Sequence, residues 1–78
     1  MKFWIVADNL SNEPEVFKIR EEAINFALGI LQDYQGRWHF EQEEYEKACA
    51  DLKNGDDNSE CWGTYIGDRE IDIFKKFI

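Results

Sequence analysis

The residues with the widest chemical repertoire in this sequence are one histidine and two cysteines. His39 lies between Trp38 and Phe40, where an imidazole could serve as a general base, a metal ligand or a stacking group. No serine or cysteine stands beside it at a local spacing, so a nucleophile–histidine arrangement has no support in the sequence. A packed or surface histidine in a connecting segment is the simpler interpretation.

The two cysteines could bind a metal only together with that histidine. Cys49 lies ten residues after His39, and Cys61 lies twelve residues after Cys49. These spacings match none of the short ligand pairs of zinc sites. Cys49 falls on the apolar side of an expected helix, where a small buried side chain is the plainer explanation. A disulfide between the two is not indicated, and we expect reduced thiols, no metal and no cofactor.

A second candidate cation site is the alternating run Asp56, Asn58 and Glu60. In the calcium loop of an EF-hand, the sixth position is glycine and the twelfth is a bidentate acid. Counted from Asp56, those positions hold Cys61 and Gly67, so the motif fails. The sequence also lacks phosphate-binding and dinucleotide-binding glycine patterns. We therefore predict that the protein is not an enzyme.

The strongest pattern is a local concentration of negative charge. The 78 residues include 17 acids and 9 basic residues, for a net charge of −8. Residues 41–60 hold eight acids against two lysines, so this stretch alone carries −6. We predict that these acids form a protein-binding face. They are Glu41, Glu43, Glu44, Glu46, Asp51, Asp56, Asp57 and Glu60.

Two explanations of this charge remain open. Carboxylates about 5–6 Å apart on a helix imitate a row of phosphates, and such a face would dock into a basic groove made for nucleic acid. Alternatively, the acids are a solvated helix face, since acids in the first turn stabilise the helix dipole without any partner. In either case, the charge disfavours nucleic acid and anionic membranes as direct partners.

The elements that must position these acids are read from hydrophobic periodicity. Residues rich in β-formers predict strands over 2–7, 15–19, 61–66 and 71–77. The first strand is apolar on both faces, which favours a central position or a covered second face. The last two form a hairpin around Gly67 and Asp68, with a loop of two or four residues. The helical period predicts helices over 21–34, ended by Gly36, and 41–54, ended by Gly55.

The apolar side chains of these elements indicate how they pack. The first helix has a broad apolar stripe, which should lie on the sheet, whereas the second has a thin one made of Tyr45, Ala48, Cys49 and Leu52. The hairpin should point Trp62, Thr64, Ile66, Ile71 and Ile73 inward. The predicted fold is α+β, a single domain over residues 1–78 with an antiparallel sheet of about four strands and two helices in the order ββααββ.

The size of the chain makes homodimerisation an open possibility, because a domain this small buries little surface alone. The largest aromatic side chains include Trp38, a candidate binding anchor because it falls in the connector between the helices and tryptophan is enriched in interface hot spots. No apolar run reaches membrane-spanning length, and the short apolar start lacks the features of a signal peptide. We expect the protein to stay in the cytoplasm.

The profile resembles small phage-encoded inhibitors of host defence of the anti-CRISPR and anti-restriction type. The resemblance is carried by the run from Glu41 to Glu46 together with Asp56 and Asp57. It implies a non-enzymatic inhibitor or modulator that binds the basic surface of a nuclease or nucleic-acid-binding complex, in some cases as a nucleic-acid mimic. The alternative is a small self-associating or accessory module, in which aromatic residues make the interface and the acids serve only solubility.

Overall fold

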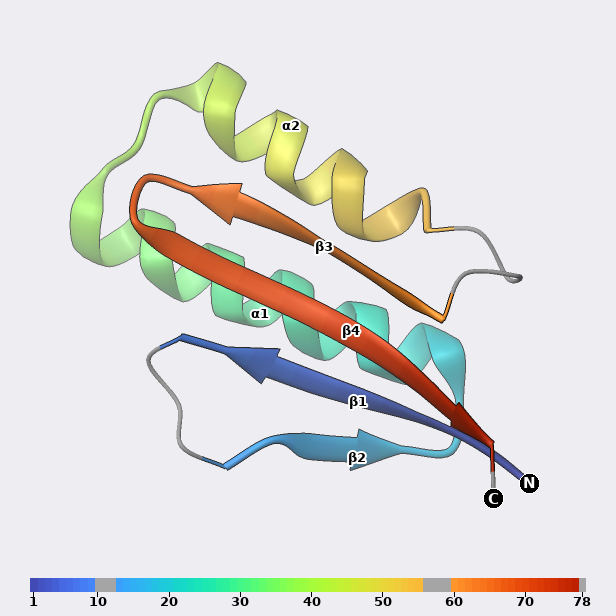
Figure 1. Ribbon diagram of the computed structural model, residues 1–78. Helices are drawn as coiled ribbons and strands as arrows, with labels where there is room; N and C mark the ends of the chain where they lie inside the picture. The colour runs from blue at the N-terminus through green and yellow to red at the C-terminus, as the bar shows by residue number, and fades with distance from the viewer. Residues whose placement is uncertain (10–12, 56–59, 78) are drawn as a thin grey trace.

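The computed structural model describes residues 1–9, 13–55 and 60–77, and its elements follow the predicted order ββααββ (Figure 1). They are β1 (Lys2–Asp8), β2 (Glu15–Phe17), α1 (Arg20–Trp38), α2 (Gln42–Lys53), β3 (Cys61–Ile66) and β4 (Arg69–Phe77). The α+β class is confirmed, with two helices and one four-stranded antiparallel sheet.

The strands follow the order β2-β1-β4-β3 across the sheet. The two hairpins share this sheet because β1 pairs along its whole length with β4, from Lys2 opposite Phe77 to Asp8 opposite Ile71. The strands nearest the two ends of the described chain therefore lie at the centre, and the central position predicted for the first strand is confirmed. β2 and β3 are the edge strands.

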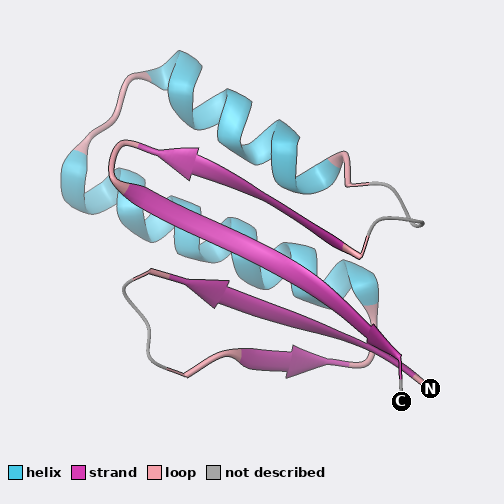
Figure 2. Cartoon of the chain, in the orientation of Figure 1, coloured by secondary structure: helices cyan, strands magenta, loops and turns pink. Residues whose placement is uncertain are grey.

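Both helices lie on the same side of the sheet (Figures 1 and 2). α1 crosses behind β1 and β4, and α2 runs beside β3. The core fills the space between the two layers and draws buried side chains from each. It consists of Val6, Ala23, Ile24, Ala27, Leu31, Tyr34, Ala48, Leu52, Ile66, Ile71 and Ile73.

Alternation along the strands assigns the remaining side chains to the other side of the sheet. We call this side the open face, because no helix of the described chain covers it. Its residues are Phe3, Ile5, Ala7, Val16, Cys61, Gly63, Tyr65, Glu70, Asp72, Phe74 and Lys76, as the strand registers require.

The inward face predicted for the C-terminal hairpin is confirmed. Thr64, Ile66, Ile71 and Ile73 are buried, and Trp62 is partly buried against the core. The hairpin closes through a two-residue turn, the shorter of the two predicted lengths, and Gly67 in this turn has a φ of 58°. A side chain is excluded there for a second reason, since a Cβ on Gly67 would lie 2.6 Å from the Phe40 ring.

The predicted end of the first helix is wrong. α1 passes through Gly36 and ends at Trp38, and His39 closes it with a φ of 51° and a backbone N–H donated to the Gln35 carbonyl. The extra turn is stabilised because Tyr34 packs edge-on against Trp38 at 5.4 Å. Gly36 lies inside the helix without a positive φ, and a Cβ there would meet nothing within 4 Å, so this glycine does not mark a chain reversal.

The other boundaries differ less from the predictions. β2 ends at Phe17 instead of Ile19, because the chain bends at residues 18 and 19 to enter α1. α2 is one residue shorter at each end than predicted, with Glu41 and Asn54 flanking it. Its thin apolar stripe is confirmed, with Ala48 and Leu52 buried.

Candidate protein-binding face

The acids of α2 extend into solvent from a helix that is held by one edge. Ala48 and Leu52 bury that edge, whereas Glu41, Glu43, Glu44 and Glu46 are all exposed. The side chain of Glu46 accepts a hydrogen bond from Gln42 at 3.1 Å, one turn earlier on the same helix. Within the described part of the chain, no ion pair engages Glu43 or Glu44.

Two of the predicted acids contribute to the fold. The carboxylate of Asp51 accepts a hydrogen bond from the Thr64 hydroxyl at 3.0 Å, which joins α2 to β3. Glu60 is exposed, but its backbone carbonyl accepts the Lys75 N–H at 2.7 Å and extends the pairing of β3 with β4. Asp56 and Asp57 lie outside the described residues. We call the four exposed acids at the start of α2, Glu41, Glu43, Glu44 and Glu46, the acidic face. Glu60 is exposed as well, but it precedes β3.

Trp38, the predicted aromatic anchor, occupies the last turn of α1 instead of the connector. Its side chain is 41% exposed, and the Arg69 guanidinium lies over its ring at 4.6 Å from the centroid. Together with Phe40 and Gly67, these two residues line a shallow hollow of about 190 Å³. Trp38 thus has intramolecular contacts on its ring while one part of it stays accessible.

The residues whose side chains could take part in catalysis lie on different elements. His39 is exposed at the end of α1, Cys49 is half-buried on α2, and Cys61 is exposed at the start of β3. Both thiols are free. Partial burial, followed by the carboxylates of Asp72 and Glu70, raises the pKa of the Cys61 thiol, which makes it a weaker nucleophile at neutral pH. Among residues 1–9, 13–55 and 60–77, no cluster of His, Cys, Asp and Glu could hold a metal ion.

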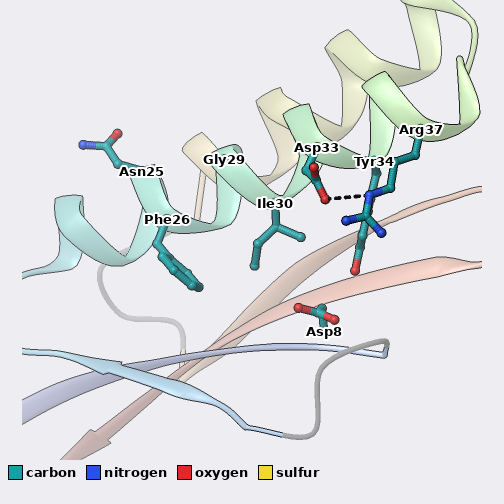
Figure 3. Close-up of a pocket in the computed structure, with 8 residues that line it drawn as sticks. All are labelled: Asp8, Asn25, Phe26, Gly29, Ile30, Asp33, Tyr34 and Arg37. Carbon is teal, nitrogen blue, oxygen red and sulfur yellow. Dashed lines mark ion pairs between the residues drawn. The ribbon is translucent and has the colours of Figure 1, made fainter.

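A groove that the sequence did not predict runs between α1 and the end of β1 (Figure 3). Its volume is about 580 Å³, and Asp8 faces Tyr34 across it while Arg37 pairs with Asp33 at 3.1 Å. Burial, and then the Asp8 carboxylate, raise the pKa of Tyr34 to about 12, so its hydroxyl stays protonated near neutral pH. The groove is wide open to solvent, which makes it a poor reaction chamber. It was missed because Asp8 and α1 are joined only by the tertiary fold.

Neither helix combines the length and the apolar character needed to cross a membrane, as judged over the described residues. Comparisons of the chain with known protein families, with curated proteins and with solved structures find no match.

Proposed function

We propose that this domain is a non-enzymatic, cytoplasmic protein that binds a basic surface of another protein through the acidic face of α2. The kind of partner that fits best is a nuclease or other nucleic-acid-binding complex, as for the phage-encoded anti-defence inhibitors that the sequence resembles. In this proposal the acidic face occupies a groove made for phosphates and blocks it.

The observation that carries the proposal is the exposure of Glu43, Glu44 and Glu46 on α2, and of Glu41 directly before it, while the helix is packed by one edge. A packed helix fixes the backbone that carries these side chains, so binding has to order only their rotamers. Residues three positions apart on a helix, such as Glu43 and Glu46, have Cβ atoms about 5–6 Å apart, so their carboxylates can present a closely spaced row of negative charge.

Electrostatic attraction would act before contact. The chain carries a net charge of −8, so a basic partner is attracted over about one Debye length, roughly 8–10 Å at physiological salt. Such steering raises the association rate and makes binding sensitive to ionic strength. Asp51 is excluded from the contact set, because its carboxylate is engaged by Thr64.

The test uses two variants with the same charge change. Glu43→Gln with Glu44→Gln removes the first-turn acids of α2, and Glu21→Gln with Glu22→Gln removes the first-turn acids of α1. Both pairs are exposed and both lie at a helix start, so the two variants lose the same dipole stabilisation and the same net charge. Each would be used for affinity capture from host lysate over a salt series.

The proposal expects one captured protein whose yield falls with salt, is lost with the α2 variant and is retained with the α1 variant. Added duplex DNA should compete for it if the captured protein binds nucleic acid. Equal capture by both variants would show that the acids of α2 serve solubility only, and the proposal would be withdrawn.

A further inference from the structure

The open face is an extended surface that the proposed function leaves unused. One row of side chains crosses all four strands on this face: Val16 lies opposite Ile5, Ile5 opposite Phe74, and Phe74 opposite Cys61. Val16 is 58% exposed, so the row reaches the solvent at the β2 edge. A continuous apolar strip on the outside of a small domain is typical of an interaction surface.

Opposite charges flank this row along β4. Lys76 lies two residues beyond Phe74, and Asp72 lies two residues before it, with Glu70 farther along the same side. At about 3.4 Å per residue, each of the two nearer charges is therefore about 7 Å from the row. The open face has a basic end, an apolar middle and an acidic end.

We propose that two copies of this chain pack open face against open face about a two-fold axis that runs along the Val16–Ile5–Phe74–Cys61 row. Such a rotation keeps the order of the strands and reverses their direction. Each row residue then meets its own counterpart, as a closed two-fold interface requires. Lys76 of one copy meets Asp72 of the other. Because of the two-fold symmetry, the dimer contains two such ion pairs.

The surroundings of Asp72 favour a cation from outside the chain. Partial burial first, and then the neighbouring Glu70, raise the pKa of the Asp72 carboxyl to about 6. The opposing residue on β3 is Gly63, where a Cβ would lie 2.3 Å from a carboxylate oxygen of Asp72. The Asp72 carboxylate therefore lies over Gly63, and a lysine of a second copy that approaches the open face would meet it there.

The area of the open face is at the small end of what a weak dimer buries. A sheet of four strands is about 19 Å wide, and the mean length of these strands is about 20 Å. Each copy therefore offers a flat area of roughly 400 Å², to which the surface of the protruding side chains adds. Two such faces come close to the lower limit of about 1,000 Å² for a specific interface. We therefore expect a weak dimer that dissociates on dilution.

This interface is independent of the acidic face. The helices lie on the opposite side of the sheet, so both copies of α2 stay exposed in the dimer (Figure 2). A variant that no longer dimerises should therefore still bind the basic partner proposed above, and the two proposals can fail independently. The charge variants at Glu43 and Glu44 should leave self-association unchanged.

The test is sedimentation equilibrium of the whole chain over roughly 1 µM to 1 mM. Lys76→Glu should weaken self-association at least tenfold, because it places two acids together at each end. Asp72→Lys should weaken it similarly, and the double variant Lys76→Glu/Asp72→Lys should restore it to within about threefold, since the pair is only exchanged. Lys47→Glu on α2 makes the same charge change as Lys76→Glu and should have no effect.

A second measurement uses the apolar row. Aligned sheets pack about 10 Å apart, so a bismaleimide of that span should join the Cys61 thiols of two copies, whereas Cys61→Ser should prevent the cross-link. A monomer at every concentration would overturn the proposal. So would a dimer that tolerates Lys76→Glu, since that dimer would use another surface such as the β3 edge. Circular dichroism of each variant shows that the fold is retained.

Discussion

The hydroxyl of Thr64 on β3 donates a hydrogen bond of 3.0 Å to a carboxylate oxygen of Asp51 on α2. Thr64 is only 4% exposed, although threonine more often lies at the surface, and it is the buried polar residue of the described core. The bond fixes the rotation of α2 about its own axis, because it holds one side of the helix against the edge strand. The directions of Glu43, Glu44 and Glu46 follow from that rotation.

Thr64→Val should therefore destabilise the fold by about 1 kcal/mol, since it keeps the shape of the side chain but removes a hydrogen bond to a charged group. Urea denaturation of Thr64→Val, Asp51→Asn and the double variant forms a complete cycle. We expect a coupling between the two positions of about 0.5–1 kcal/mol. Additive effects would show that the two side chains act separately.

Two glycines should respond in opposite ways to an added methyl group. Gly29 is inside α1, and a Cβ there meets nothing within 4 Å, so Gly29→Ala should stabilise the fold by about 0.5–1 kcal/mol. A Cβ on Gly63 would lie 2.4 Å from the Ile71 carbonyl oxygen, which belongs to the backbone of the neighbouring strand. Gly63→Ala should therefore cost about 2 kcal/mol or more. Both effects would be measured as shifts in the urea concentration at the midpoint of unfolding, with the dependence of the unfolding free energy on urea unchanged.

Stability should fall as the pH rises through about 6, because the folded state binds the Asp72 proton more tightly than the unfolded state does. The carboxyl titrates at its ordinary 3.8 when exposed, so its contribution is largest below that pH and is lost by neutrality. Glu70 on the same strand and Tyr65 and Cys61 on β3 share its electrostatic environment. Thermal unfolding of dilute protein at pH 5 and pH 7 measures the difference.

Asp72→Asn is the matched control for this pH dependence. The amide keeps the size of the side chain and has no proton to lose, so the difference in melting temperature between pH 5 and pH 7 should shrink. If the variant retains the full difference, another group is responsible for the pH dependence.

Arg20 joins three elements near the end of the sheet. Its guanidinium donates to the Gly55 carbonyl after α2 and lies 5.2 Å from the Trp62 ring centre on β3. The Trp62 indole N–H in turn donates to the Leu52 carbonyl at 3.0 Å. Arg20→Met should cost about 1–2 kcal/mol and change the tryptophan fluorescence, because it removes both the hydrogen bond and the cation–π contact. Arg20→Lys should recover part of the stability.

The sequence predicted the helices and strands well wherever the apolar pattern repeated over many residues. The apolar stripe of α2 and the inward face of the last hairpin were both found, because the alternation of Thr64, Ile66, Ile71 and Ile73 allows only one face to be buried. The end of α1 was missed, because Gly36 is a usual stop signal and the contact of Tyr34 with Trp38 depends on the folded helix.

Other features required the tertiary structure. The strand order depends on the pairing of β1 with β4 across almost the whole sequence, and no local pattern encodes a pairing at that distance. The predicted acids shared one charge pattern, but only the structure separates Asp51, which is exposed but accepts a hydrogen bond from Thr64, from the acids at the start of α2. The open face depends in the same way on the placement of both helices on one side.

The position of β4 has a consequence for the order in which the domain can be completed. This strand lies between β1 and β3, yet it is the last of the six elements to be synthesised. Until Phe77 has left the ribosome, β1 has no partner on its inner edge and α1 has only part of the sheet to pack on. The native sheet therefore cannot be completed before the end of β4, and fragments that stop before it should lack the central pairing of β1 with β4.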